Sequence, residues 1–196
     1  MVEPPADPLV TALDAHAALL AGVRDEQWTG STPCPDWNVR TLVNHVVSGN
    51  RMFAAILRGD PLPPPDELAR LRARDILGTD PLAAFRSTGA ELYTAFGSPG
   101  VLDRVVQAPV GPLPGRAVLH LRITELLVHG WDLAHATGQP VVLPEDLAEE
   151  DIVFTRGLFA AGVPRQGRFG AAAQVPAGVA AIDRLAAELG RTVPVD

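Results

Sequence analysis

The pattern of apolar and polar residues along the chain predicts an all-α protein. Apolar residues recur every three or four positions in six stretches, which is the spacing that gathers them on one face of a helix. Segments rich in Pro and Gly, which interrupt helices and favour turns, separate these stretches. The predicted helices are Pro8–Val23, Val39–Arg58, Pro81–Phe96, Arg116–Thr137, Pro144–Gly162 and Gly178–Leu189.

The helix predicted over Arg116–Thr137 is apolar nearly all round, and such a helix belongs in a core. Four of its polar residues form one stripe, because at about 100° per residue they fall within roughly 80° of one another. These are Arg122, Glu125, His129 and Asp132. Buried ionisable groups are costly unless they pair or bind a metal. We therefore expect this stripe to do one or the other.

A metal site can be assembled from this stripe and the second predicted helix. Glu125 and His129 are four residues apart, so they stack on one helix face and can hold one ion between them. His45 flanks the apolar stripe of Val39–Arg58, and Gly49, one turn on, leaves space beside the imidazole. Alone, His45 is typical of a boundary histidine. Together the three side chains form a two-His, one-carboxylate set, which leaves coordination positions open as in catalytic metal sites.

The loop before the second helix, residues 26–39, is dense in Pro, Gly, Ser and Thr and contains Trp28 and Trp37. Aromatic rings in a loop usually pin it to the body of the protein. We expect the two rings to form a wall over the bundle end, where they either contact a ligand or only pack. Cys34 lies between two prolines with no base close in sequence. We expect it to be neither a nucleophile nor a metal ligand.

The remaining segments supply connectors and isolated histidines. His16 falls beside the apolar stripe of the first helix, which is typical of a surface or boundary histidine. Residues 70–74, with regularly spaced Arg, indicate a short solvated helix or loop, and Val105–Val110 a short extended piece. His120 and His135 point well away from the polar stripe on the helical projection, so we do not expect them to be ligands.

Composition narrows the classes of function. At 196 residues we expect one domain. No uninterrupted apolar run approaches the roughly 18 residues of a membrane span, and the N-terminus lacks the basic segment of a signal peptide, so we expect a cytoplasmic protein. The single cysteine excludes an internal disulfide. The net charge of -7 argues against nucleic acid or membrane partners. All 16 basic residues are Arg, which excludes Schiff-base lysine chemistry.

Two long segments resemble a known family. The stretches STPCPDWNVRTLVNHVVSG and RITELLVHGWDLAHATGQP are similar to the actinobacterial branch of the DinB-like superfamily, close to the N-terminal domain of mycothiol-dependent maleylpyruvate isomerase. The resemblance implies a four-helix bundle and a divalent metal, usually zinc. The ligands that it implies are His45, Glu125 and His129. We expect residues 1–196 to form a single domain of this type, with 139–196 as a C-terminal helical extension packed on the bundle.

Two hypotheses about function follow from the residues and the resemblance. The first is a metal-dependent transferase or isomerase, a monomer or homodimer, that uses a small thiol, mycothiol by resemblance, on an electrophilic substrate held near Trp28 and Trp37. Arg122 would pair with Glu125 or receive a substrate carboxylate, and Asp132 would orient a ligand histidine. The alternative is a non-catalytic bundle, a binding or stress-associated module, whose polar stripe is an internal network with or without a structural ion.

Overall fold

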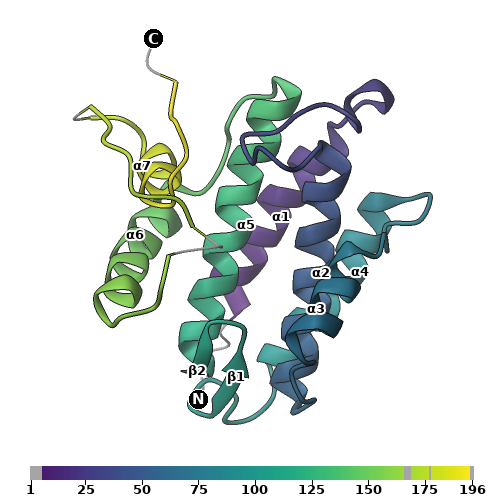
Figure 1. Ribbon diagram of the computed structural model, residues 1–196, viewed down its shortest axis with the longest axis vertical. Helices are drawn as coiled ribbons and strands as arrows, with labels where there is room; N and C mark the ends of the chain where they lie inside the picture. Colours follow the sequence, from purple (N-terminus) through teal and green to yellow (C-terminus); the bar gives the residue numbers. More distant parts are fainter. Residues whose placement is uncertain (1–5, 166–168, 177, 195–196) are drawn as a thin grey trace.

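The computed structural model describes residues 6–165, 169–176 and 178–194, and the predicted all-α class is confirmed (Figure 1). Besides its helices, this part of the chain forms a short 3₁₀ turn (Asp25–Gln27) and one hairpin of two strands. All six predicted helices are present with ends within a few residues of those expected. The helices are α1 (Ala6–Ala21), α2 (Val39–Arg58), α3 (Pro65–Ala73), α4 (Pro81–Phe96), α5 (Gly115–Thr137), α6 (Glu145–Ala160) and α7 (Ala181–Glu188).

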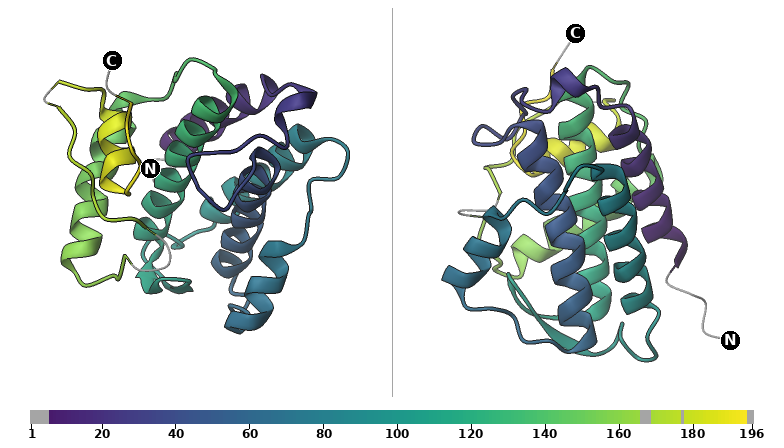
Figure 2. Two further views of the ribbon diagram at one scale, coloured as in Figure 1. Left: turned by 45° about the horizontal axis from the view of Figure 1, so that its top comes forward. Right: turned by 90° about the vertical axis from the view of Figure 1, so that its right-hand side faces the viewer.

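Four of these helices form a bundle, as the resemblance implies. Around the bundle, α1 contacts α5, α5 contacts α2, α2 contacts α4, and α4 contacts α1. The right-hand view of Figure 2 shows the four helix axes running roughly along one direction. The faces that these helices turn toward one another carry Leu, Val, Ile and Phe side chains that are almost completely buried. Burial of this apolar surface is the main term that holds such a bundle together.

Local sequence signals set the ends of the bundle helices. The side chain of Asn38 accepts a hydrogen bond from the Thr41 amide and caps α2, while Asp80 caps α4 in the same way. Gly59 after α2 and Gly138 after α5 have φ values of 102° and 64°. Such left-handed residues commonly terminate helices, and glycine adopts them without steric cost.

Helix α5 is buried on nearly every side because two groups of helices cover it. The bundle covers one side, and α6 and α7 pack together against the other (Figure 1). Trp131, only 1% exposed, lies between α5 and this outer pair, and its indole donates a hydrogen bond to Asp183 on α7. This double coverage explains why the sequence of α5 is apolar nearly all round.

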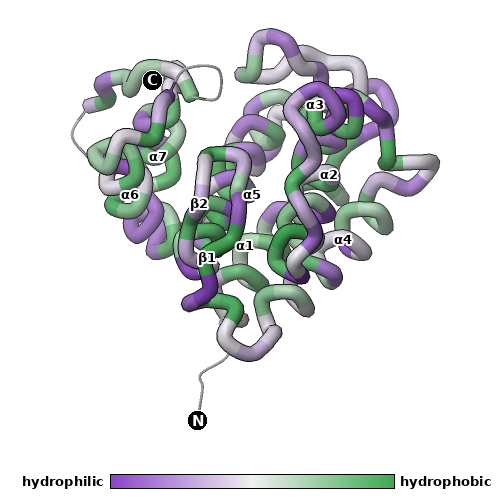
Figure 3. The backbone as a smooth tube through the Cα atoms, turned by 60° about the horizontal axis from the view of Figure 1, so that its bottom comes forward, coloured by the Kyte–Doolittle hydropathy of each residue, from purple (hydrophilic) through white to green (hydrophobic). Residues whose placement is uncertain are grey.

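The remaining elements lie on the outside of the bundle. The arginine-rich stretch forms α3, none of whose residues is buried, which agrees with the predicted short solvated helix. The extended piece expected over Val105–Val110 is a strand, β1 (Val105–Ala108), and it pairs antiparallel with β2 (Gly111–Pro114), which the sequence pattern did not predict. The hairpin lies at the end of the bundle seen in Figure 3.

The prediction for His16 is wrong, because this side chain is 0% exposed. Its imidazole is stacked on Phe85 of α4, and its Nδ1 lies 3.0 Å from the carbonyl oxygen of Leu126 on α5. Burial lowers the pKa of His16 to about 4, so the ring is neutral at physiological pH. A backbone carbonyl that accepts the Nδ1–H proton satisfies one side of the ring and makes an interior position tolerable.

Among the described residues, no helix is both long and apolar enough to cross a membrane.

Candidate metal centre

Helices α2 and α5 lie side by side, and both contribute to one polar cluster. His45 belongs to α2, while Glu125 and His129 lie one turn apart on α5. The His45 Nε2 atom lies 3.1 Å from Glu125 Oε2, and His129 Nε2 lies 4.0 Å from the same oxygen. One ligand atom from each residue lies within 4.8 Å of the other two. The structure thus brings together the three residues that the sequence singles out as metal ligands.

These three side chains fit a divalent ion. With metal–ligand bonds of about 2.0–2.1 Å, neighbouring ligand atoms of a tetrahedral zinc ion lie roughly 3.3 Å apart. The 3.1 Å separation already has this spacing, and the 4.0 Å separation requires only a small movement of His129. The His45 and Glu125 side chains are 23% and 22% exposed, so small molecules can reach the cluster from solvent.

The surroundings shift the pKa values of Glu125 and His45 in the directions that favour metal binding. Burial alone would raise the pKa of Glu125, but the hydrogen bond from His45 and the positive charges nearby outweigh it and keep the pKa well below its usual range. Burial lowers the pKa of His45, which favours the neutral imidazole. Metal ligands must be deprotonated, so both shifts favour coordination.

Arg122 lies behind this cluster and is 0% exposed. Its guanidinium donates to the Asn50 side chain at 3.0 Å, to the Val46 carbonyl at 3.1 Å and to Glu125 at 3.5 Å. A Cβ atom at Gly49 would lie 2.6 Å from Arg122 Nη1. The expectation that Gly49 makes room for the His45 imidazole is therefore wrong, because this glycine makes room for the guanidinium.

This geometry favours one of the two roles considered for Arg122. Burial lowers the pKa of Arg122 to about 10, so the guanidinium is still charged at neutral pH. Because it is fully buried, it cannot touch a substrate carboxylate that enters from solvent. Pairing with Glu125 is the role that the contacts support.

Asp132 lies on the opposite edge of the His129 ring. Its Oδ2 atom lies 2.9 Å from His129 Nδ1, and Arg191 binds both carboxylate oxygens, Nε to Oδ1 at 3.2 Å and Nη2 to Oδ2 at 2.8 Å. Burial alone would raise the pKa of Asp132, but the hydrogen bonds from His129 and Arg191 lower it to about 2. An ionised carboxylate at Nδ1 keeps a proton there and turns Nε2 toward Glu125.

The loop before α2 is folded over this cluster by its own hydrogen bonds. The Thr32 hydroxyl donates to the Trp37 carbonyl at 2.9 Å, and Ser31 pairs with Asn38 across the loop. The Trp37 ring consequently lies over both histidines of the cluster, with ring centroids 4.6 Å from His45 and 5.6 Å from His129.

The two tryptophans of this loop have different surroundings. Trp28 is half-buried against the hydrophobic core, and its carbonyl accepts a hydrogen bond from the Arg40 amide. In the described part of the chain, Trp37 is the tryptophan whose ring contacts the ligand histidines. The structure thus brings Trp37 to the centre, while the contacts of Trp28 are those of a packing residue.

Cys34, which we expect to be neither a nucleophile nor a metal ligand, lies beside Asp132 in the fold. Its Sγ atom lies 3.3 Å from Asp132 Oδ2 and 3.3 Å from Arg191 Nη2. Burial and the Asp132 carboxylate raise the pKa of the Cys34 thiol to about 12, so it is protonated and donates to the carboxylate. Sequence reasoning missed Cys34, Arg191 and Asn50 because no local pattern marks them, and only the fold brings them to α5.

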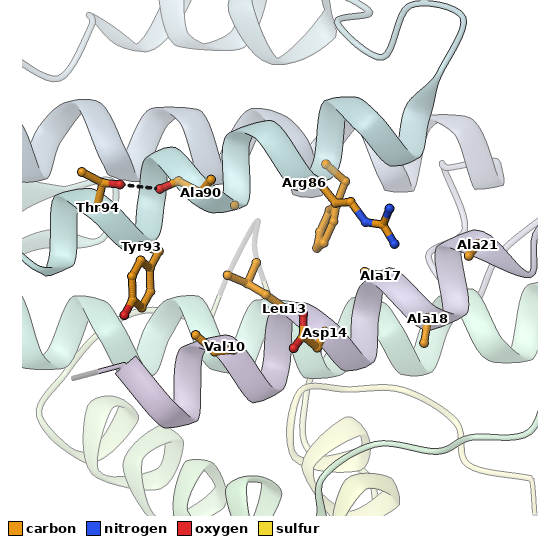
Figure 4. Close-up of a pocket in the computed structure, with 12 residues that line it drawn as sticks. Val10, Leu13, Asp14, Ala17, Ala18, Ala21, Arg86, Ala90, Tyr93 and Thr94 are labelled. Carbon is orange, nitrogen blue, oxygen red and sulfur yellow. Dashed lines mark hydrogen bonds between the residues drawn. The ribbon is translucent and has the colours of Figure 1, made fainter. Parts of the chain in front are cut away.

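A separate groove of about 540 Å³ lies between α1 and α4 (Figure 4). Leu13 and Phe85 contribute to its walls, with Val10 and Tyr93 farther along it. None of the three candidate ligands lines this groove, so it is not part of the metal centre.

A four-helix bundle with a His/Glu/His cluster between two facing helices belongs to the class of helical bundles that carry a polar site between their helices. Within this class, the family model of the mycothiol maleylpyruvate isomerase N-terminal domain matches residues 9–134. The chain therefore belongs to this family, as the two sequence segments indicate.

Two further relatives and two solved structures are similar to this chain. The uncharacterized proteins MT0763 and Rv0738, from two strains of Mycobacterium tuberculosis, are each 37% identical over 191 residues, which is 95% of this chain and 99% of theirs. Crystal structures of the mycothiol-dependent maleylpyruvate isomerase and of its histidine-to-alanine mutant share the fold, with TM-scores of 0.59 and 0.61 and identities of 18% and 17%. The match covers 72% of this chain and 65% of the isomerase chain.

Proposed function

We propose that this protein is a metal-dependent enzyme that uses a low-molecular-weight thiol, with mycothiol as that thiol, in a transfer or isomerisation reaction on a small electrophile. The observation that carries the proposal is the convergence of His45, Glu125 and His129 beneath a partly open surface. Membership of a family named for a mycothiol-dependent isomerase supports the choice of thiol.

The three converging side chains would hold the ion, for which zinc suits two imidazoles and a carboxylate. Zinc bound there would lower the pKa of a thiol and favour the reactive thiolate. Glu125 enters this role already ionised and held by Arg122, and His45 enters it neutral. Glu125 therefore needs no change of protonation, whereas the proton that His45 Nε2 donates to Glu125 has to leave this nitrogen before it can bind the ion.

Other residues would position the reactants. Trp37 offers an apolar wall beside His45 and His129, against which a thiol or an electrophile can pack. Asp132 would keep the proton of His129 on Nδ1, so that Nε2 faces the ion. Trp28 would act through the loop, because its own contacts are with the core.

A second candidate function has an observation of its own. His45 and Arg122 each hydrogen-bond Glu125, and His129 and Arg191 each hydrogen-bond Asp132. These polar contacts would also stabilise a non-catalytic binding module. Access of a thiol to the ion distinguishes the two functions, because a purely structural ion has no open position.

Cobalt in place of zinc gives a direct test of the proposal. Addition of mycothiol to the cobalt protein should produce a near-ultraviolet band from sulfur-to-cobalt charge transfer and release a proton, since the thiolate is the ligand. The cobalt protein without added thiol serves as the control. A spectrum that stays unchanged at millimolar mycothiol, with cobalt still bound, would reject the thiol reaction and favour the structural module.

A further inference from the structure

Cys34, His129 and Asp132 form a second group of potential metal ligands, on the far edge of the His129 ring. One ligand atom from each of them lies within 4.8 Å of the other two, as in the first set. The two groups share His129 but use different edges of it, because Nε2 faces Glu125 and Nδ1 faces Asp132. A thiol, an imidazole and a carboxylate are a set that zinc and cobalt accept.

Arg191 fills the place that a cation would take in this second group. Its guanidinium binds both oxygens of Asp132 and lies 3.3 Å from Cys34 Sγ, while Nη1 donates to the Leu189 carbonyl. The side chain is 11% exposed, and the Asp132 carboxylate that it faces is 0% exposed. A guanidinium carries a permanent charge, and its planar fork matches a carboxylate.

We propose that Arg191 acts as a built-in replacement for a second metal ion and so decides which edge of His129 binds metal. Its charge balances Asp132 and repels a divalent ion at short range. With that carboxylate engaged, Cys34 remains a thiol and His129 keeps its Nδ1 proton. Metal binding at His129 Nε2 rests on the proposed function. The part of the proposal that concerns Cys34, His129 and Asp132 does not.

Removal of the charge at position 191 should expose the latent site. In the Arg191→Gln variant the aliphatic stem remains, but Asp132 and Cys34 no longer face a cation. A divalent ion that accepts thiolate ligands, such as cobalt or cadmium, should then bind through Cys34 Sγ, Asp132 and His129 Nδ1, and both the thiol proton and the Nδ1 proton pass to the buffer. Arg191→Lys keeps a cation at this position and should leave the site closed.

Cobalt titration without any added thiol tests this proposal. We expect one ion and no sulfur-to-cobalt band for the wild type and for Arg191→Lys, and a second equivalent with a near-ultraviolet band for Arg191→Gln. The band should disappear in the Arg191→Gln, Cys34→Ser double variant. It should persist when His45→Ala is combined with Arg191→Gln, because His45 belongs to the other edge.

Two outcomes would overturn the proposal: a Cys34-dependent band in the wild type, or a folded Arg191→Gln protein that shows none. Circular dichroism reports folding, and if Arg191→Gln does not fold, Arg191→Met carries the same test with an apolar stem. A wild type without bound cobalt, together with a Cys34-dependent band in Arg191→Gln, would reject the proposed function and still support this inference.

Discussion

At the residue scale, the arrangement of the candidate metal centre depends on Gly49, which has no side chain. Gly49 lies where α2 passes the Arg122 guanidinium, and a Cβ there would lie 2.6 Å from the nitrogen that faces Glu125. Arg122 is fully buried and bonded on all sides, so it cannot move aside freely. The glycine is thus required by a contact between two helices and not by a turn.

We expect Gly49→Ala to destabilise the protein by about 1–3 kcal/mol, the range for overpacking a filled interior. The matched control is Gly157→Ala on the exposed face of α6, where a new Cβ meets nothing within 4 Å. Alanine there should stabilise by about 0.5–1 kcal/mol, because it is the better helix former. Urea unfolding measures the change in stability of both variants. A neutral or stabilising Gly49→Ala would show that Arg122 has room that the structure does not give it.

Asp132 provides a second test at this scale. Asp132→Asn keeps the shape of the side chain but removes the charge that holds the proton on His129 Nδ1. We expect metal affinity to fall by roughly 10 to 100-fold, as for other groups that orient a ligand histidine. Competition with a chelator of known affinity measures the change. Equal affinities would limit Asp132 to a packing role.

The part of the candidate site that lies on a single helix could be predicted from the sequence. Arg122, Glu125, His129 and Asp132 follow from the periodicity of one helix, and that stripe is buried or half-buried as expected. The contribution of Arg191 could not be predicted, because it lies 59 residues beyond Asp132 and follows the last helix. Only packing of the C-terminal segment on α5 brings it there.

At the element scale, helix boundaries could be predicted wherever capping residues and periodicity coincide. Helix α2 begins after Asn38 and ends before Gly59, as its sequence indicates. The strand β2 could not be predicted, because Pro112 and Pro114 lack the amide donors that strands normally use. The prediction for His16 is wrong because helical periodicity puts this residue at the edge of the apolar face of α1, whereas α4 and α5 enclose that edge.

The burial of His16 between α1, α4 and α5 predicts a pH dependence of stability. Its pKa is about 4 in the folded protein against 6.5 when exposed, so the unfolded chain binds more protons between these values. Stability therefore falls as the pH drops below 6.5, and this group contributes a loss of about 2 kcal/mol between pH 7 and pH 5. The charge of the Arg122 guanidinium adds to the depression of the pKa.

Urea unfolding of wild type and His16→Phe at pH 7 and pH 5 isolates this effect. Phenylalanine preserves the stacking on Phe85 but does not titrate, so the variant should lose less stability on acidification. The other histidines contribute equally to both proteins. Identical losses in the two proteins would mean that His16 is protonated, or exposed, in the folded state.

At the scale of the whole molecule, we propose that residues 139–196 are an integral part of a single domain. Helices α6 and α7 cover the face of α5 that the bundle leaves open, and Trp131 and Arg191 tie that cover to α5 by hydrogen bonds to Asp183 and Asp132. Without this extension, the apolar side of α5 would be exposed to water. Large exposed apolar patches lead to aggregation.

A chain that ends at residue 138 should therefore fail to unfold cooperatively, and should aggregate when concentrated. The full chain should show one thermal transition, because its two halves share α5. Circular dichroism and light scattering measure both properties. A truncated chain with a cooperative transition near that of the full chain would mean that the extension is a separate, dispensable unit.

The metal content of ligand variants tests the central claim most directly. We expect protein purified without chelator to contain close to one divalent ion per chain, and His45→Ala, Glu125→Ala and His129→Ala each to lose most of it. A double variant should be little worse than a single one, because the remaining ligands hold one ion poorly. His135→Ala, a histidine of the same helix outside the cluster, is the control. Full metal content in His45→Ala, or less than about a tenth of an ion in the wild type that no added zinc restores, would contradict the account.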